Sequence, residues 1–232
     1  SSANTIFIVG NTIRGGASSG AESYGVLLGD GSASSTGLIE LFGNNIDGGQ
    51  GLNSAGLRIN GFGGVAAFKN RIYGGAALNE NIGVVASVLN SLEFINNQVH
   101  GGGAGGSSNT EAVRMGAFGS SVVARLRNNT MFSGSAANAA RGLVFSNASG
   151  GGGNFASLFV DNNIIFVTLL QTTVKHCVAE DVATVPTGFR NNFFYQCDTN
   201  GGGVAYIEGS TPVGVNEPSN NAFANISPEL YL

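Results

Sequence analysis

Charged residues are scarce in this sequence. Asp, Glu, Lys and Arg make up only 10% of the 232 residues, and the net charge is −4. Proteins that bind nucleic acid carry clustered Lys and Arg side chains that contact phosphates, and the sequence has no such cluster. We therefore expect no nucleic-acid partner.

Long apolar runs are also lacking. No segment approaches the roughly eighteen consecutive apolar residues of a membrane-spanning helix, so we expect no membrane span. No signal peptide opens the chain, which we interpret as a mature or excised sequence. Low charge with abundant Asn, Gly, Ser and Thr is more typical of a secreted β protein than of a cytosolic enzyme. This composition predicts an extracellular or cell-surface location.

Cysteine and histidine occur only twice each. Cys177 and Cys197 either form one disulfide, which would agree with an oxidising compartment, or remain two separate buried thiols. His100 and His176 have no Cys or carboxylate partner at the spacing of a metal site. The sequence thus predicts no metal ion and no cofactor.

What the chain has in abundance is a short phrase built on asparagine. An Asn, a variable residue and an apolar residue recur along the chain, often followed by two glycines. By subtraction, the steps between copies are 26 to 33 residues, a period typical of solenoids, propellers and helical arrays. The asparagines taken as equivalent are Asn11, Asn44, Asn70, Asn97, Asn129, Asn162, Asn191 and Asn221.

The content of each unit predicts short strands. Runs rich in Val, Ile, Leu and Phe alternate with clusters of Gly, Ser and Asn, which are strand and turn signals. Helices are disfavoured because each interior Gly costs about 1 kcal/mol relative to Ala. In the second unit we expect strands over 38–42, 45–47 and 56–60, a corner at 43–44 and a turn at 61–64. Three strands would close one turn of a solenoid.

Asparagines stacked one strand spacing apart would bond to one another through their amides and form an internal ladder. Short strands joined by an Asn-x-Ile or Asn-x-Val corner resemble the right-handed parallel β-helix of pectate lyases, polygalacturonases and many bacterial surface proteins. The resemblance implies an all-β fold, a single right-handed parallel β-helix of about seven to eight turns. We expect one domain over 1–232, with regular turns over 5–165 and atypical, capping turns over 166–232.

Two residues before each ladder asparagine lies a second column, which includes Phe42, Phe68 and Ile95. Strand alternation directs this column outward, where it would form an exposed apolar stripe for self-association. The alternative is a bulge that turns the three side chains inward. Glu93 and Arg125 fall on neighbouring turns and are expected to form an ion pair.

Residues suited to chemistry are few. Arg58 and Arg114 lie at equivalent positions two turns apart, Glu111 is close to Arg114, and together they are the candidate contacts to an acidic sugar. The alternative is that they are solvated surface charges. The paired aspartates and Gly-His-Gly turn of polygalacturonase-like enzymes do not occur in the sequence, and neither does a calcium-binding carboxylate cluster. We therefore predict no catalytic residue.

These observations favour a non-catalytic structural or adhesive module. Because the first strand begins without a helix to cover it, its edge would invite pairing with another chain, and we expect end-to-end stacking into a filament. The alternative hypothesis is a β-helix that binds or cleaves a polysaccharide through Arg58, Glu111 and Arg114.

Overall fold

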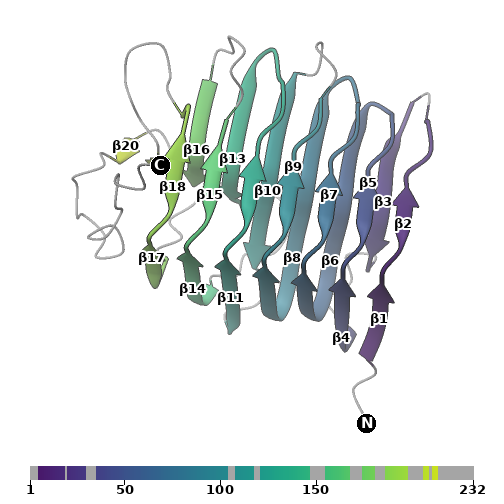
Figure 1. The fold of residues 1–232 in the computed structure, drawn as a ribbon, viewed down its shortest axis with the longest axis horizontal. Coiled ribbons are helices and arrows are strands. Elements are labelled where there is room, and N and C mark those ends of the chain that lie inside the picture. The colour runs from purple at the N-terminus through teal and green to yellow at the C-terminus, as the bar shows by residue number, and fades with distance from the viewer. Residues whose placement is uncertain are drawn as a thin grey trace.

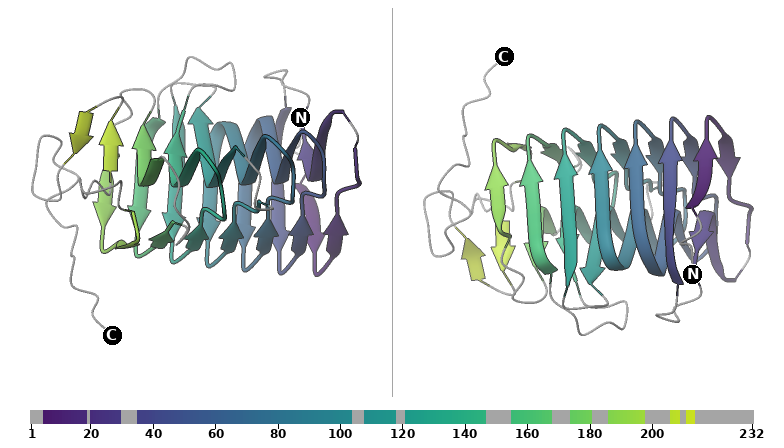
Figure 2. Two further views of the ribbon diagram at one scale, coloured as in Figure 1. Left: turned by 90° about the horizontal axis from the view of Figure 1, so that it is seen from above. Right: turned by 90° about the horizontal axis from the view of Figure 1, so that it is seen from below.

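The fold is an all-β parallel solenoid, as the sequence predicted. A computed structural model describes residues 5–18, 20–29, 35–103, 108–117, 121–146, 155–167, 174–180, 186–197, 206–208 and 211–213. These residues contain strands and no helix, and the strands stack in parallel along one axis (Figures 1 and 2). Except for β20, which forms a short antiparallel pair, each described strand pairs in parallel with the equivalent strand of a neighbouring turn.

Three ladders of strands wind around the axis. The first arm contains β1 (Thr5–Val9), β4 (Ser35–Phe42), the ends of β6 (Asn53–Phe68) and β8 (Glu80–Ile95), β11 (Val122–Arg127), β14 (Phe155–Asp161) and β17 (Gly188–Arg190). The short-strand sheet contains β2 (Thr12–Arg14), β5 (Asn45–Asp47), β7 (Arg71–Tyr73), β9 (Gln98–His100), β12 (Thr130–Phe132), β15 (Ile164–Phe166) and β18 (Phe193–Tyr195). The second arm contains β3 (Glu22–Leu28), the beginnings of β6 and β8, β10 (Asn109–Ala117), β13 (Ala139–Phe145), β16 (Val174–Glu180) and β19 (Tyr206–Glu208), with β20 (Thr211–Val213) antiparallel to β19.

The two arms are continuous where β6 and β8 pass from one to the other. The turn predicted at 61–64 is therefore wrong, because β6 continues through it to Phe68. Gly61 has a φ of 74° and the pairing register with β8 shifts on either side of Phe62, so the strand bends without ending. A bulge changes the course of a strand while most of its ladder hydrogen bonds are kept.

The described residues form about five turns of the solenoid, fewer than the seven to eight predicted. The prediction assigned one turn to each of eight asparagines. Asn221, however, lies outside the described residues, and Asn11 and Asn192 stand where the described ladder begins and ends. Each corner is only one part of a turn, so counting one complete turn for every corner, including those at the two ends of the ladder, gives too many turns.

The core is a set of apolar columns that run along the axis. In the first arm the residue three positions before each ladder asparagine faces inward, as for Leu41, Phe94 and Leu126, each at most 2% exposed. Strand alternation explains this pattern, since every second side chain points to the same face. Continuous burial of these columns stabilises one turn against the next.

The asparagine ladder exists, but two of its predicted members are wrong. Asn11, Asn44, Asn70, Asn97 and Asn129 are members, and the next two are Asn163 and Asn192, each 1% exposed. Asn162 and Asn191 instead lie one residue earlier, exposed, with φ of 57° and 54°. Both corners contain two consecutive asparagines, and the outer one takes the left-handed conformation that the chain needs to turn.

The glycine pair after several short strands has two separate causes. At Gly48 a Cβ atom would collide with the backbone oxygen of Gly74 on the next turn, so the turns stack closely only without a side chain. Gly49 has a φ of 81°, which is accessible to Gly at little cost. A Cβ atom at Gly49 would also collide, with the backbone oxygen of Gly16 on the preceding turn, so close stacking requires both glycines and the positive φ is a second requirement at Gly49.

Cys177 and Cys197 form a disulfide. Cys177 lies on β16 of the second arm, and Cys197 follows β18 of the short-strand sheet. The bond links two elements that meet near the C-terminal end of the described solenoid.

Candidate functional site

A groove of about 360 Å³ runs over the outer face of the short-strand sheet. Each short strand has three residues, of which the middle one points into the core and the outer two point to solvent, as in Arg71, Ile72 and Tyr73 of β7. The groove lies between the two outward columns. It crosses the four strands β7, β9, β12 and β15, with Asn45 of β5 at one end.

Aromatic rings form one wall of the groove. Tyr73, His100, Phe132 and Phe166 occupy the same position on successive turns. Their ring centroids are 4.9, 4.5 and 4.5 Å apart in that order, and the rings of Phe132 and Phe166 are nearly parallel. The ring of Tyr73 is tilted against that of His100, and His100 meets Phe132 edge to face, so only Phe132 and Phe166 are stacked.

Polar side chains form the other wall: Asn45, Arg71, Gln98 and Thr130. Arg71 donates a hydrogen bond from Nε to Oε1 of Gln98 over 3.1 Å. Among the described residues no carboxylate forms an ion pair with Arg71. The groove therefore combines an apolar wall with a row of hydrogen-bonding groups and one arginine free to bind a ligand.

His100 lies in the ring wall as a neutral side chain. Burial lowers its pKa, and the backbone N–H of Gly102 donates a 2.8 Å hydrogen bond to its Nδ1. With Nδ1 as acceptor, the neutral imidazole carries its proton on Nε2. Burial and, to a smaller extent, the charge of Asp47 raise the pKa of Tyr73, which keeps the phenol protonated.

The sequence prediction did not identify this groove. Its signal is an aromatic residue three positions after the ladder asparagine: Tyr73 follows Asn70, His100 follows Asn97, and Phe132 follows Asn129. The same offset in the last two described corners requires Asn163 and Asn192 as ladder members. Because the sequence prediction took Asn162 and Asn191 as ladder members, this regular spacing was not recognised.

The predicted ligand contacts lie elsewhere, on the second arm. Arg58 and Arg114 do share one column, separated by Val85. A small pocket of about 90 Å³ lies beside them, which has the volume of about three water molecules. Arg58 donates a 2.7 Å hydrogen bond to the hydroxyl of Tyr24 and forms an ion pair with Glu22.

Glu111 is buried in the same network, with only 1% of its side chain exposed. Arg114 donates to it over 2.7 Å and Arg141 over 3.2 Å, while Arg114 also pairs with Glu80. Burial alone would lower the pKa of Arg114, but the charges and hydrogen bonds of Glu111 and Glu80 outweigh it and raise that pKa. These carboxylates and arginines satisfy one another, so the geometry is that of an ion-pair network rather than an open sugar site.

The apolar stripe lies on the outer face of the first arm, as alternation predicted. Phe42 is 45% exposed, and Phe68 and Ile95 are partly exposed. The ammonium group of Lys69 lies 5.6 Å from the centre of the Phe42 ring. Counted from Asn162 and Asn191, the outward column would also contain Val160 and Phe189. Both are buried, because the ladder members are Asn163 and Asn192.

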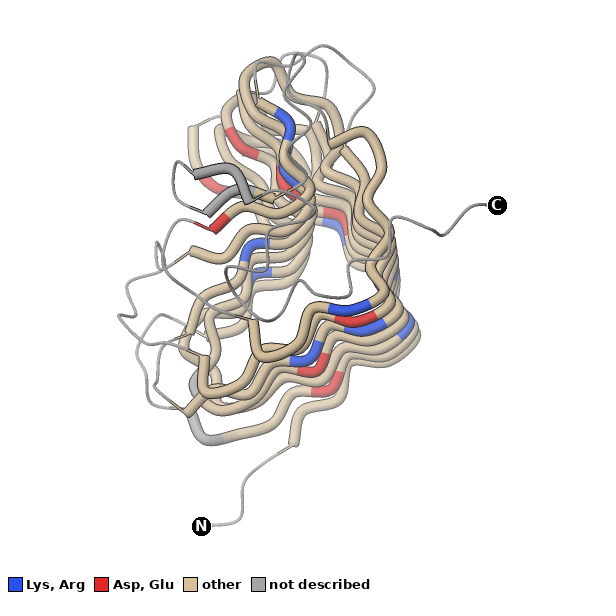
Figure 3. The backbone as a smooth tube through the Cα atoms, turned by 90° about the vertical axis from the view of Figure 1, so that its left-hand side faces the viewer, with Lys and Arg blue, Asp and Glu red and all other residues tan. Residues whose placement is uncertain are grey.

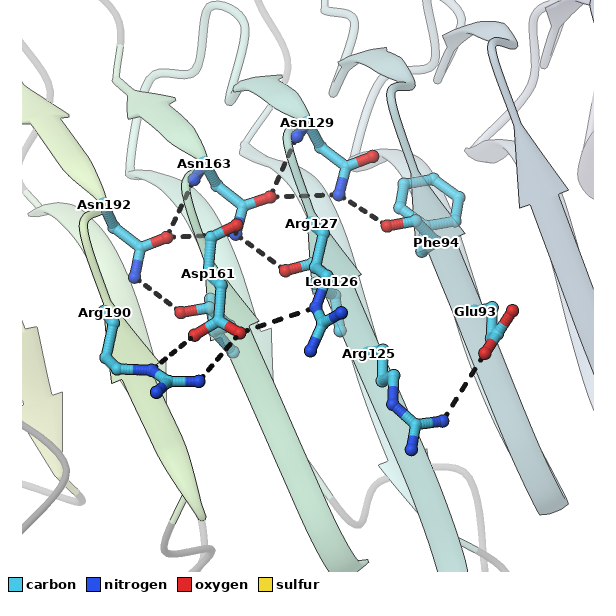
Figure 4. Close-up of polar contacts among 11 residues, drawn as sticks. Glu93, Phe94, Arg125, Leu126, Arg127, Asn129, Asp161, Asn163, Arg190 and Asn192 are labelled. Carbon is cyan, nitrogen blue, oxygen red and sulfur yellow. Dashed lines mark hydrogen bonds and ion pairs between the residues drawn. The ribbon is translucent and has the colours of Figure 1, made fainter.

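Charged residues continue this face toward the C-terminal end, where they follow one another from turn to turn (Figures 3 and 4). Glu93 and Arg125 form the predicted ion pair over 3.4 Å. Asp161 accepts contacts from two arginines, Arg127 at 3.5 Å and Arg190 at 3.3 Å. The first arm thus has an apolar and acidic half followed by a basic half.

No group of three or more His, Cys, Asp or Glu side chains that could hold a metal ion occurs among the described residues. Within the same part of the chain, no helix is long and apolar enough to cross a membrane. Comparison with known proteins finds no matching family model, no matching curated protein and no matching solved structure. The fold and the arrangement of its outer faces therefore carry the functional argument.

Proposed function

We propose that the chain is a non-catalytic structural or adhesive module that holds an extended ligand along the groove of the short-strand sheet. The single observation that supports this best is the groove itself, which continues over successive turns between a ring wall and a polar wall. A linear groove suits a linear ligand, because equivalent contacts repeat at each strand spacing of about 4.8 Å.

The proposal includes a secreted or cell-surface location. The low charge and the disulfide between Cys177 and Cys197 support it, since disulfides persist mainly in oxidising compartments. We also retain the resemblance to the pectate-lyase-like β-helix proteins of the bacterial secreted type as part of this proposal.

Binding to the groove is tested with an array of neutral and acidic glycans and extended peptides. The Tyr73→Ser variant removes a ring from the wall, while Tyr195→Ser removes an exposed ring of the same column outside the groove. We expect Tyr73→Ser to weaken binding at least fivefold and Tyr195→Ser to leave it unchanged. A chain that retains no ligand, or loses it equally in both variants, contradicts the proposal.

The alternative function is binding or cleavage of a polysaccharide through Arg58, Glu111 and Arg114. The pocket beside the two arginines and their shared column support it. The mutual ion pairs of Glu111 and Arg114 count against it, because a paired, buried carboxylate is a poor base. Turnover of an acidic polysaccharide that Arg114→Gln abolishes would establish this alternative and overturn the non-catalytic proposal.

End-to-end stacking into a filament stays a prediction. At β1, Ile6 is 46% exposed and Phe7 is 64% exposed, and β1 pairs with β4 on one side only within the described residues. Light scattering at increasing protein concentration tests it, and particles that lengthen with concentration are expected. A size that stays constant contradicts stacking.

A further inference from the structure

The outer face of the short-strand sheet changes from polar to apolar along the solenoid axis (Figure 1). The first three strands, β2, β5 and β7, carry these outward side chains: Thr12, Arg14, Asn45, Asp47, Arg71 and Tyr73. The outward side chains of β15 and β18 are Ile164, Phe166, Phe193 and Tyr195, and none of them is charged. Ile164 and Tyr195 are 45% and 52% exposed. The groove crosses the boundary between these two parts, so its ends differ in chemistry.

The polar end of the groove carries one uncompensated positive charge. Asp47 lies beside Arg14 in the register of β2 and β5, and its Oδ1 accepts a 3.0 Å hydrogen bond from the backbone N–H of Gly49. Within the described part of the chain, Arg71 donates from Nε to Gln98 and forms no ion pair. Its two terminal amino groups can therefore hold a carboxylate in the bidentate geometry that arginine favours.

The polar wall continues on both sides of Arg71 with side chains that donate and accept hydrogen bonds. Gln98 and Thr130 follow it on β9 and β12, and Asn45 precedes it on β5. A plain alkyl chain in the groove would displace the water around these groups without replacing its hydrogen bonds, which loses affinity. A peptide backbone has an N–H and a C=O group at nearly every residue and can replace them.

We propose, on the basis of the function proposed above, that the ligand of the groove is an extended peptide with an acidic residue at the Arg71 end and apolar residues at the Ile164 end. β7 and β15 are three strand spacings apart, about 14 Å. In an extended peptide the side chains at i, i+2 and i+4 point to the same side, and i and i+4 are about 13 Å apart. An acidic residue at i thus reaches Arg71, while apolar residues at i+2 and i+4 lie near Phe132 and Ile164.

A polysaccharide matches this face less well. Its repeating units resemble one another, so they suit a face of uniform chemistry better than one that changes from charged to apolar. At the Ile164 end its hydroxyl groups would lie against Ile164 and Phe166, where the outward positions of β15 offer no polar side chain. Hydroxyl groups that lose water without gaining a partner cost free energy. The apolar end therefore favours the peptide.

The first experiment measures the fluorescence polarisation of a labelled peptide, Glu-Ser-Phe-Ser-Leu with blocked ends, on the full chain. We expect replacement of its Glu by Gln to weaken binding about fivefold, the upper range for an exposed ion pair. The same replacement should have no effect on the Arg71→Gln variant, because the partner of the carboxylate is already gone. Lys69→Gln is the matched control, since it removes a positive charge two positions earlier, outside the groove. It should leave the fivefold difference unchanged.

The second experiment locates the apolar end of the peptide. Replacement of its Leu by Ser is expected to weaken binding about threefold on the parent chain, through loss of apolar contact. On the Ile164→Thr variant the same replacement should have no effect. Ile164 is exposed and threonine keeps the β-branched shape, so the circular dichroism spectrum of this variant should be unchanged.

The outcomes separate this inference from the proposed function. Coupling of the peptide's Glu to Arg71 and of its Leu to Ile164 supports the inference. Peptide binding that lacks one or both couplings overturns it. If the peptide does not bind but a glycan does, and Tyr73→Ser weakens the glycan, the inference is overturned and the proposed function stands. If the groove holds neither peptide nor glycan, both are wrong.

Discussion

The inside and the outside of each corner obey different rules, although the two positions are neighbours in sequence. The inner position is asparagine in every described turn, from Asn11 to Asn192. The outer position just before it is occupied by Gly10, Gly43, Lys69, Asn96, Asn128, Asn162 or Asn191, all with positive φ. One position is fixed by its side chain, and the other only by its backbone conformation.

Hydrogen bonding explains why the inner position does not vary. Asn97 accepts from both the backbone N–H and the side chain of Asn70, while its own Nδ2 donates to Asn129 and to the carbonyl of Ala67. Only an amide both accepts and donates in this way, and a carboxylate would lack the donors. At the outer position any residue serves that tolerates the left-handed region, which Gly and Asn do best.

The largest effect is expected from breaking the inner position. Asn97→Leu removes the acceptor of Asn70 and the donor to Ala67, and each buried polar group left without a partner costs about 1–3 kcal/mol. We expect a loss of several kcal/mol in the free energy of unfolding, measured by urea denaturation. Asn96→Gly is the control at the adjacent outer position, and an equal loss in both variants would refute the distinction.

A smaller effect is expected from breaking the outer position. Asn128 has a φ of 55° and is exposed, and Asn128→Val places a β-branched residue in the left-handed region. Such strain costs about 1–2 kcal/mol. The measurement is thermal unfolding beside Asn128→Gly, which should stay close to the parent. A valine variant as stable as the glycine variant would mean that the corner adopts another conformation.

The smallest change in stability is expected from removing backbone strain at an outer corner position. Lys69 is the one outer residue among the described corners that is neither Gly nor Asn, with a φ of 55°. We expect Lys69→Gly to raise the free energy of unfolding by at most about 0.5 kcal/mol, since the relief is offset by the flexibility of Gly in the unfolded chain. Lys69→Met keeps the strained backbone and removes only the charge near Phe42. If Lys69→Met stabilises as much as Lys69→Gly, the charge and not the backbone is responsible.

The sequence was sufficient to predict the parallel solenoid and the first five ladder asparagines, while for Phe42, Phe68 and Ile95 it left an outward stripe and an inward bulge as alternatives. These features depend on period and alternation, which are local properties. The consecutive asparagines at 162–163 and 191–192 misled the prediction, because inner and outer positions both accept Asn. Apolar spacing on the preceding strand, with Val160 and Phe189 inward, would have resolved the choice.

The outer faces were harder to predict because they depend on register between turns of unequal length. Glu80 and Arg114 meet although they are 34 residues apart, and Glu111 meets Arg141 at a separation of 30. A variable period hides such pairs until the strands are aligned. The groove required the same alignment, since its four rings come from four different turns.

The side-chain amides of the asparagine ladder give the whole solenoid a direction. The side-chain oxygen of each ladder asparagine accepts hydrogen bonds from the preceding turn, and its N–H groups donate hydrogen bonds to the following turn. The amide dipoles therefore add rather than cancel along the axis. The two ends of the ladder are consequently unlike: one end presents a hydrogen-bond acceptor and the other presents N–H donors. Any further turn that extends the ladder must therefore have the same orientation as the turn with which it pairs.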